Sequence, residues 1–111
     1  MPGRSGEQRL LDLLGLAARA GAIVVGTDMV RGAIRKGEVH FAILATDGST
    51  TQRRKLAPLL EARGVPHGIH LERERLGAAV GRPPLSAIGL TDSAFARRAA
   101  ELAVALSPPR E

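Results

Sequence analysis

The sequence predicts an α/β domain whose helices cover both faces of a mainly parallel or mixed four-stranded sheet. The first reason is that apolar runs of strand length alternate with longer segments whose apolar residues recur at helical spacing. The second is that glycine, proline and small polar residues separate these segments, without repeats, linkers or low-complexity stretches. We therefore expect one domain at residues 6–106, with flexible tails at 1–5 and 107–111.

The first half of the chain begins with a helix and contains two strands. Ser5 and Gln8 have the spacing of a capping box, and leucines and alanines then recur at helical spacing until Gly21. Residues 22–25 are apolar and predict a short strand. The apolar run at 40–45 is continuous, which is typical of a strand buried on both faces.

The middle of the chain contains a longer helix and a weak strand. Residues 47–50 predict a turn and a cap that lead into a helix at 51–63. Pro58 lies inside this helix and should bend it or shift its start. Residues 67–70 have proline and glycine beside or within them, which indicates a short strand at the sheet edge. A short helix at 72–80 follows.

The last part of the chain contains one strand and one helix. Gly81 ends the short helix, and residues 86–90 predict a strand. Thr91 or Asp92 caps the last helix, whose apolar residues recur at helical spacing. The residues expected to end this helix are Pro108 and Pro109.

The stretch from Gly26 to Gly37 has the pattern of a turn, a cap and a helix. Gly26 permits a sharp turn after the first strand, Thr27 can cap the helix, and Gly37 suits a left-handed C-terminal position. A helix start after a glycine turn attracts anions, because its amides and positive dipole end are exposed. Three cations follow within two turns: Arg31, Arg35 and Lys36. The alternative is an ordinary helix cap with a solvated basic face.

The composition favours a polyanionic partner. The net charge is +5, and all but two of the 16 basic residues are arginine, which suits bidentate contacts to phosphate and guanine. A GC-rich genome would also favour arginine, alanine, glycine and proline. The chain has no Tyr or Trp, so nucleic-acid contacts would not depend on stacking by these aromatic residues. There is no Cys, which excludes disulfides, thiolate metal sites and cysteine nucleophiles.

The apolar run from Leu10 is broken by Asp12, Gly15 and Arg19, so it is neither a signal-peptide core nor a membrane span. Cytoplasmic localisation is therefore expected.

No pattern predicts catalysis, a metal site or a cofactor. His67 and His70 are three residues apart on an extended segment, so they face opposite sides, and no acidic cluster lies near them in sequence. Residues 49–51 precede a helix, and capping explains their hydroxyl groups. Neither a Gly-Lys-Ser/Thr phosphate loop nor a Gly-x-Gly-x-x-Gly run occurs. The basic triplet at 53–55 is typical of a solvated helix face.

Two segments carry residues that suit RNA. Arg31 and Arg35 share one helical face with Asp28. The Asp28 carboxylate can accept hydrogen bonds from guanine N1 and N2, and the arginines can hold phosphate or guanine O6 and N7. The segment Arg82-Pro83-Pro84-Leu85 is a rigid loop with an apolar tip, suited to pressing against an unstacked base. As a turn alone, it needs no ligand.

Several short motifs occur together in one order. They are Leu14-Gly15-Leu16-Ala17-Ala18-Arg19-Ala20-Gly21, Gly26-Thr27-Asp28, Ala42-Ile43-Leu44-Ala45-Thr46-Asp47, Gly64-Val65-Pro66 and Leu76-Gly77-Ala78-Ala79-Val80-Gly81. This order resembles the kink-turn RNA-binding ribosomal protein superfamily, which includes the archaeal protein called seven-Ae and the eukaryotic protein called thirty-e. The opening Leu-Gly-Leu-Ala and the ending Thr91-Asp92-x-x-Phe95-Ala96 look most like its bacterial YlxQ-like branch.

The resemblance implies a three-layer α-β-α sandwich, with a four-stranded mixed sheet and about five helices, and no catalysis. Members grip a kinked RNA duplex in which tandem sheared G·A pairs follow a three-nucleotide bulge. The contact motif of the superfamily, Gly-Thr-Asn-Glu-x-x-Lys, corresponds here to Gly26, Thr27, Asp28, Met29 and Gly32. The glycine and threonine match, but the three polar contacts do not, and Arg31 or Arg35 is the candidate for the missing charge. The second contact region corresponds to residues 82–85.

The sequence thus predicts a non-enzymatic protein that recognises structured, kink-turn-like RNA through a degenerate contact motif. The predicted RNA-binding residues are Gly26, Thr27, Asp28, Met29, Arg31, Gly32, Arg35, Lys36, Arg82, Pro83, Pro84 and Leu85. The expected partners are ribosomal RNA or other kink-turn-containing RNA, together with ribosomal or translation-factor proteins, without cofactor, metal or membrane. The alternative is a protein-interaction adapter on the same fold that has lost kink-turn binding.

Overall fold

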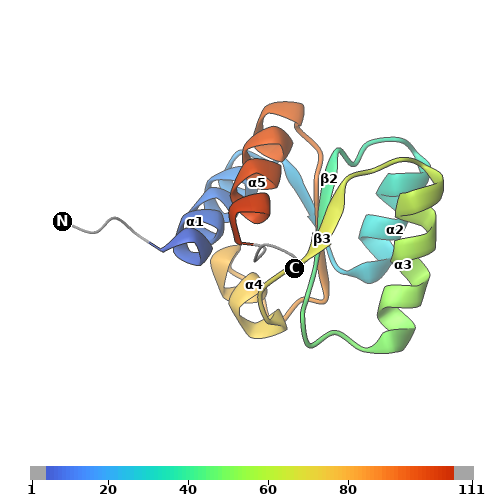
Figure 1. Cartoon of the computed structure of the whole chain (residues 1–111), viewed down its shortest axis with the longest axis horizontal. Helices are drawn as coiled ribbons and strands as arrows, with labels where there is room; N and C mark the ends of the chain where they lie inside the picture. Colours follow the sequence, from blue (N-terminus) through green and yellow to red (C-terminus); the bar gives the residue numbers. More distant parts are fainter. Residues whose placement is uncertain (1–4, 107–111) are drawn as a thin grey trace, which may run out of the picture.

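The computed structural model describes residues 5–106, which form three layers (Figure 1). Helices α1, α4 and α5 cover one face of the sheet, and helices α2 and α3 cover the other. The elements in chain order are α1 (Gly6–Arg19), β1 (Ile23–Val25), α2 (Thr27–Arg35), β2 (Phe41–Leu44), α3 (Thr50–Ala62), β3 (His67–Ile69), α4 (Arg73–Ala79), β4 (Ala87–Leu90) and α5 (Ser93–Leu106). The predicted layers are therefore confirmed. Pro108, Pro109 and the predicted tails, apart from Ser5, lie outside the described residues.

The four strands form one mixed sheet, as the sequence predicts, and their order in the sheet is β1-β4-β2-β3. Strand β4 pairs antiparallel with β1 on one side and with β2 on the other, while β2 and β3 are parallel. Gly89 of β4 lies opposite both Val24 and Ala42. A side chain there would come within 3.2 Å of the side chains of Val24 and Val39, so glycine allows the central strand to pack closely.

Side chains of the central strands alternate between two hydrophobic cores. Phe41 and Ile43 of β2 pack with α1, α4 and α5, whereas Ala42 and Leu44 pack with α2 and α3. All four residues of β2 are buried, which confirms the prediction of a strand covered on both faces. Full burial of one Leu or Ile side chain contributes about 1.5–3 kcal/mol to the free energy of unfolding. The two cores together therefore fix how both helical layers lie on the sheet.

Polar side chains begin three of the helices as predicted. Ser5 accepts from the Gln8 amide at 3.1 Å, and Ser49 accepts from the Gln52 amide at 3.1 Å. Asp92 caps α5, because its Oδ1 accepts from the amides of Ala94 and Phe95. Each of these bonds satisfies an amide that the helix itself leaves unpaired.

Helix α3 begins at Thr50 and continues through Pro58 to Ala62, so this proline does not shift the helix start. The ring of Pro58 removes the bond to the Arg54 carbonyl. Both residues are exposed, so water can take the place of the missing amide.

Candidate nucleic-acid interface

The turn between β1 and α2 is built on Gly26. Its φ of 88° and ψ of 148° lie in a region that suits glycine, and its amide donates to the Ala87 carbonyl at 3.0 Å. The turn is thereby tied to the start of β4. The prediction that Thr27 caps the helix is wrong, because Gly26 occupies the capping position and Thr27 is the first helical residue. Within residues 5–106, no side chain caps this helix start.

The first turn of α2 presents two exposed side chains. Asp28 and Met29 are exposed, and Met29 has 66% of its surface accessible, although it is a large apolar residue. The next residue, Val30, is fully buried and holds the helix on the sheet. The helix start therefore offers a carboxylate, a thioether and amides without a side-chain cap at the surface.

The cations of α2 are available for a ligand. Within residues 5–106, Arg31, Arg35 and Lys36 form no ion pair with a carboxylate. Arg31 is half-buried, while Arg35 and Lys36 are exposed in the last turn. There they also complement the negative end of the helix dipole. Gly37, with a φ of 75°, ends the helix as predicted.

The loop from Arg82 to Leu85 lies directly against α4. The Arg82 amide donates to the Gly77 carbonyl at 2.8 Å, and the Leu85 amide donates to the Arg73 carbonyl at 3.0 Å. A Cβ added at Gly77 would lie 2.1 Å from the Pro83 carbonyl oxygen, far inside contact distance. Gly77 is thus required for the loop to approach the helix, and the sequence motif contains it without showing this reason.

Met29 of α2 and Arg82 of the loop border one surface hollow of about 450 Å³. We call this the Met29–Arg82 hollow. Its remaining lining is mostly apolar and comes from the end of α1, strand β1 and the end of α4: Ala18, Gly21, Ile23, Val24, Val25 and Val80. The structure therefore brings the two predicted contact segments together, although they are far apart in the chain.

Other predicted residues lie outside this hollow. Thr27 lies instead beside Gln52, Arg53 and Ser86, toward α3. Pro83 and Pro84 are exposed, whereas Leu85 is half-buried and packs against the core beneath α1, α4 and α5. The exposed apolar tip of the loop consequently consists of the two prolines without Leu85.

Arg53 departs from the solvated face predicted for the triplet at 53–55. Its guanidinium donates to the Ala45 carbonyl at 3.0 Å and to the Thr46 carbonyl at 2.6 Å. Arg54 and Lys55 are exposed, as the pattern predicts. No sequence pattern indicates this role of Arg53, because its acceptors are backbone carbonyls of the segment that follows β2.

The described residues contain no group of three His, Asp or Glu side chains that could hold a metal ion. His67 Nδ1 lies 2.9 Å from the Val65 carbonyl oxygen, and burial lowers the pKa of His70. Between residues 5 and 106, no helix is long and apolar enough to cross a membrane.

The fold places a mixed four-stranded sheet between two helical layers. The start of α2 and the α4–β4 loop meet beside the edge strand β1. These features define a class of small three-layer proteins. Residues 8–99 match the family described as the ribosomal protein L7Ae/L30e/S12e/Gadd45 family, and the chain belongs to it. The resemblance seen in the ordered motifs is thereby confirmed, including the YlxQ-like branch.

Two curated relatives are similar to this chain over most of their length. The RNA-binding protein YlxQ of Bacillus subtilis (strain 168) is 31% identical over 86 residues, which cover 78% of this chain and 86% of that protein. The RNA-binding protein YlxQ of Enterococcus faecium is 26% identical over 96 residues, or 86% of this chain and 92% of that protein.

Two solved structures share the fold. A protein with unknown function from Bacillus halodurans C has a TM-score of 0.81 and 34% identity, covering 84% of this chain and 94% of that one. The Giardia lamblia 15.5kD RNA binding protein has a TM-score of 0.76 and 21% identity, and the match covers 96% of this chain and 91% of that one. The second similarity concerns the fold alone.

Proposed function

We propose that this chain is a non-enzymatic RNA-binding protein that recognises structured, kink-turn-like RNA in the cytoplasm. We propose that it acts in translation, where it binds ribosomal RNA and lies next to ribosomal or translation-factor proteins. The observation that carries the proposal is the Met29–Arg82 hollow, in which the start of α2 and the α4–β4 loop meet. The family membership and the names of the YlxQ relatives support it.

Phosphate groups would bind at the basic side of α2. The amides of its first turn have no side-chain cap, and the helix dipole favours negative charge at that end. Arg31, Arg35 and Lys36 are free of carboxylate partners in the described chain and can pair with successive phosphates. These contacts fix the position of the RNA and carry no sequence information.

An unstacked base would enter the Met29–Arg82 hollow. Valines of β1 and α4 give it apolar walls, Met29 lies at its edge, and the Arg82 guanidinium can reach a phosphate or base oxygen. Pro83 and Pro84 stiffen the loop, so little conformational freedom would be lost on binding. Because the hollow contains no aromatic residue, the base would be held by aliphatic packing.

Recognition of the G·A pairs would differ from that of the superfamily motif. Asp28 accepts hydrogen bonds but cannot donate as Asn does, Met29 offers neither, and Gly32 carries no charge. Among the described residues, no atom outside the local helix backbone lies within 4 Å of a Cβ added at Gly32, so the missing lysine is not excluded by lack of space. We therefore propose a kink-turn-like target that is read through shape and phosphate contacts more than through guanine edges.

The test compares binding to a kink-turn RNA with binding to the same duplex after replacement of its G·A pairs. We expect the kinked RNA to bind more tightly, and the affinity for both to fall steeply with salt, with a log–log slope of about −0.7 to −0.9 per phosphate. Equal, salt-independent affinities would contradict the proposal. Sequencing of RNA crosslinked to the protein in cells would then identify the natural target.

A further inference from the structure

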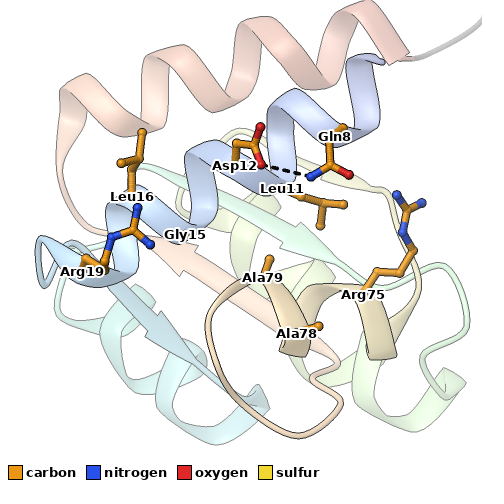
Figure 2. Close-up of a pocket in the computed structure, with 9 residues that line it drawn as sticks. All are labelled: Gln8, Leu11, Asp12, Gly15, Leu16, Arg19, Arg75, Ala78 and Ala79. Carbon is orange, nitrogen blue, oxygen red and sulfur yellow. Dashed lines mark hydrogen bonds between the residues drawn. The ribbon is translucent and has the colours of Figure 1, made fainter. Parts of the chain in front are cut away.

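A second hollow, unconnected with the predicted RNA contacts, lies between α1 and α4 (Figure 2). With a volume of about 560 Å³, it is larger than the Met29–Arg82 hollow. We call it the α1–α4 groove. Helix α1 contributes one wall over three turns, and α4 contributes the other: Gln8, Leu11, Asp12, Gly15, Leu16 and Arg19, facing Arg75, Ala78 and Ala79.

Small residues keep this groove open where the two helices touch. A Cβ added at Gly15 would lie 3.0 Å from the Ala79 carbonyl oxygen, so the backbones are in close contact there. Ala78 and Ala79 do not fill the space beside that contact (Figure 2). Leu16 remains 51% exposed at the rim, although a leucine gains free energy when it is covered. The groove thus has an apolar part, at Leu16 and Ala78, without a cover in the described chain.

Cationic groups lie at both ends of the groove. Arg19 folds back along α1, since its Nη1 would lie 3.7 Å from a Cβ at Gly15, and it has no carboxylate partner within residues 5–106. At the other end, Arg75 donates to Glu7. Asp12 is the acidic group along the wall, and it accepts from Gln8 Nε2 at 3.0 Å. Outside the Arg75–Glu7 ion pair, the charged groups of the groove are therefore Asp12 on the α1 wall and Arg19 at one end.

This combination fits a protein helix better than RNA. Asp12 lies on the α1 wall and would repel a phosphate backbone that ran along the groove. From Gln8 to Arg19, α1 rises by roughly 16 Å, which matches about three turns of a partner helix. An apolar face with side chains at positions i, i+3 or i+4, and i+7 would cover Leu16 and Ala78. A carboxylate at one end would complement Arg19.

We propose that the α1–α4 groove binds an amphipathic helix of another protein, whose apolar face covers Leu16 and whose carboxylate at one end pairs with Arg19. This inference concerns a different surface from the proposed RNA contacts. Arg19 lies between Ala18 and Gly21, which border the Met29–Arg82 hollow, so the bound helix would lie beside the RNA. The chain would then join an RNA and a protein at adjoining sites.

The experiment selects peptides of about 12 residues from a randomised display library on the full chain, with parallel selections on Leu16→Glu and Val104→Glu. Val104 is the matched control, because it is 72% exposed and lies on α5, outside the groove. We expect the enriched peptides to share helically spaced apolar residues and an acidic end. Their binding should fall at least tenfold on Leu16→Glu and remain unchanged on Val104→Glu.

A charge exchange tests the role of Arg19. Selection on Arg19→Glu should yield peptides that carry lysine or arginine in place of the acidic end, because the charge at position 19 has been reversed. Amide NMR of the parent chain with an enriched peptide should then show shifts in α1 and α4 and none in α2. Urea denaturation of each variant confirms that it folds.

Three results would overturn the proposal. The first is that enriched peptides bind equally to the parent and to folded Leu16→Glu. The second is that Arg19→Glu leaves the charge of the enriched peptides unchanged. The third is that kink-turn RNA shifts the amide signals of α1 and α4 and binds Arg19→Glu more weakly than the parent. That result would show that the groove belongs to the RNA-binding surface.

Discussion

The start of α2 and the α4–β4 loop border the same hollow, but they are held in position in different ways. The loop is fixed by close backbone contact, since a Cβ at Gly77 would lie 2.1 Å from the Pro83 carbonyl oxygen. At the start of α2, by contrast, Asp28 and Met29 are exposed, and a Cβ at Gly32 would meet nothing within 4 Å. Only the backbone turn at Gly26 is constrained there.

This difference shows where the contact surface is free to vary. Substitutions at Asp28, Met29 and Gly32 are expected to change the proposed RNA surface without disturbing packing, because Asp28 and Met29 are exposed and a side chain at Gly32 would have space. The loop cannot vary in the same way, because its position depends on the absence of a side chain on α4. The departures from the superfamily motif occur in the first region, where the fold tolerates them.

The largest expected effect is that of Gly77→Ala. The added methyl group overlaps backbone atoms, so the loop or the helix must move, at a cost of about 1–3 kcal/mol in the free energy of unfolding. Urea denaturation measures this cost, and amide NMR measures the displacement of Arg82 and Leu85. RNA affinity should fall with the loop displaced. Unchanged stability together with unchanged amide positions would show that the loop is not held by this contact.

The next prediction concerns the open region. Asp28→Asn combined with Met29→Glu and Gly32→Lys should strengthen preference for a kink-turn over the duplex without G·A pairs. Asn both donates and accepts, Glu accepts from a guanine edge, and a well-made base contact contributes about 1–3 kcal/mol of discrimination. Both RNAs are compared at one salt concentration. If the folded triple variant gains no preference, α2 is not the recognition helix.

Arg53→Ala tests the support behind the loop. Its guanidinium holds the Ala45 and Thr46 carbonyls, and the Ala45 amide is bonded to the Ser86 carbonyl just after the loop. Loss of these bonds should lower the free energy of unfolding by about 1–2 kcal/mol. Arg54→Ala is the matched control, because Arg54 is exposed on the same helix. Equal effects of the two substitutions on thermal unfolding would contradict the structural role of Arg53.

Arg82→Ala should change the salt dependence of RNA binding. If its guanidinium neutralises one phosphate, the log–log slope decreases in magnitude by about one unit. Arg97→Ala removes the same charge from the exposed surface of α5, outside the hollow, and should leave the slope unchanged. Identical slopes for the parent and Arg82→Ala would place this residue outside the phosphate contacts.

The smallest expected effect is that of Gly32→Ala, the counterpart of Gly77→Ala in the open region. No atom obstructs the added methyl group, and alanine is the better helix former by about 0.5–1 kcal/mol. The free energy of unfolding should therefore rise by this amount. A loss of stability on urea denaturation would show that the space beside Gly32 is not open.

The sequence by itself determined the elements and their local ends. Ser5, Ser49 and Asp92 cap helices through bonds to amides two or three residues further along, so the chain pattern contains both partners. The continuous apolar run of β2 predicted burial on both faces. These interactions are local or follow from hydrophobic periodicity, which is why the strands, the layers and the family resemblance were predicted from sequence alone.

Only the tertiary structure decided how the site is assembled. The strand order β1-β4-β2-β3, the meeting of Met29 with Arg82, and the contact of Gly77 with Pro83 all join segments far apart in the chain. The prediction of a Thr27 cap was wrong because the turn at Gly26 is set by its bond to Ala87 on another strand. Side-chain patterns record burial and capping, but backbone contacts between distant segments leave little pattern beyond a single glycine.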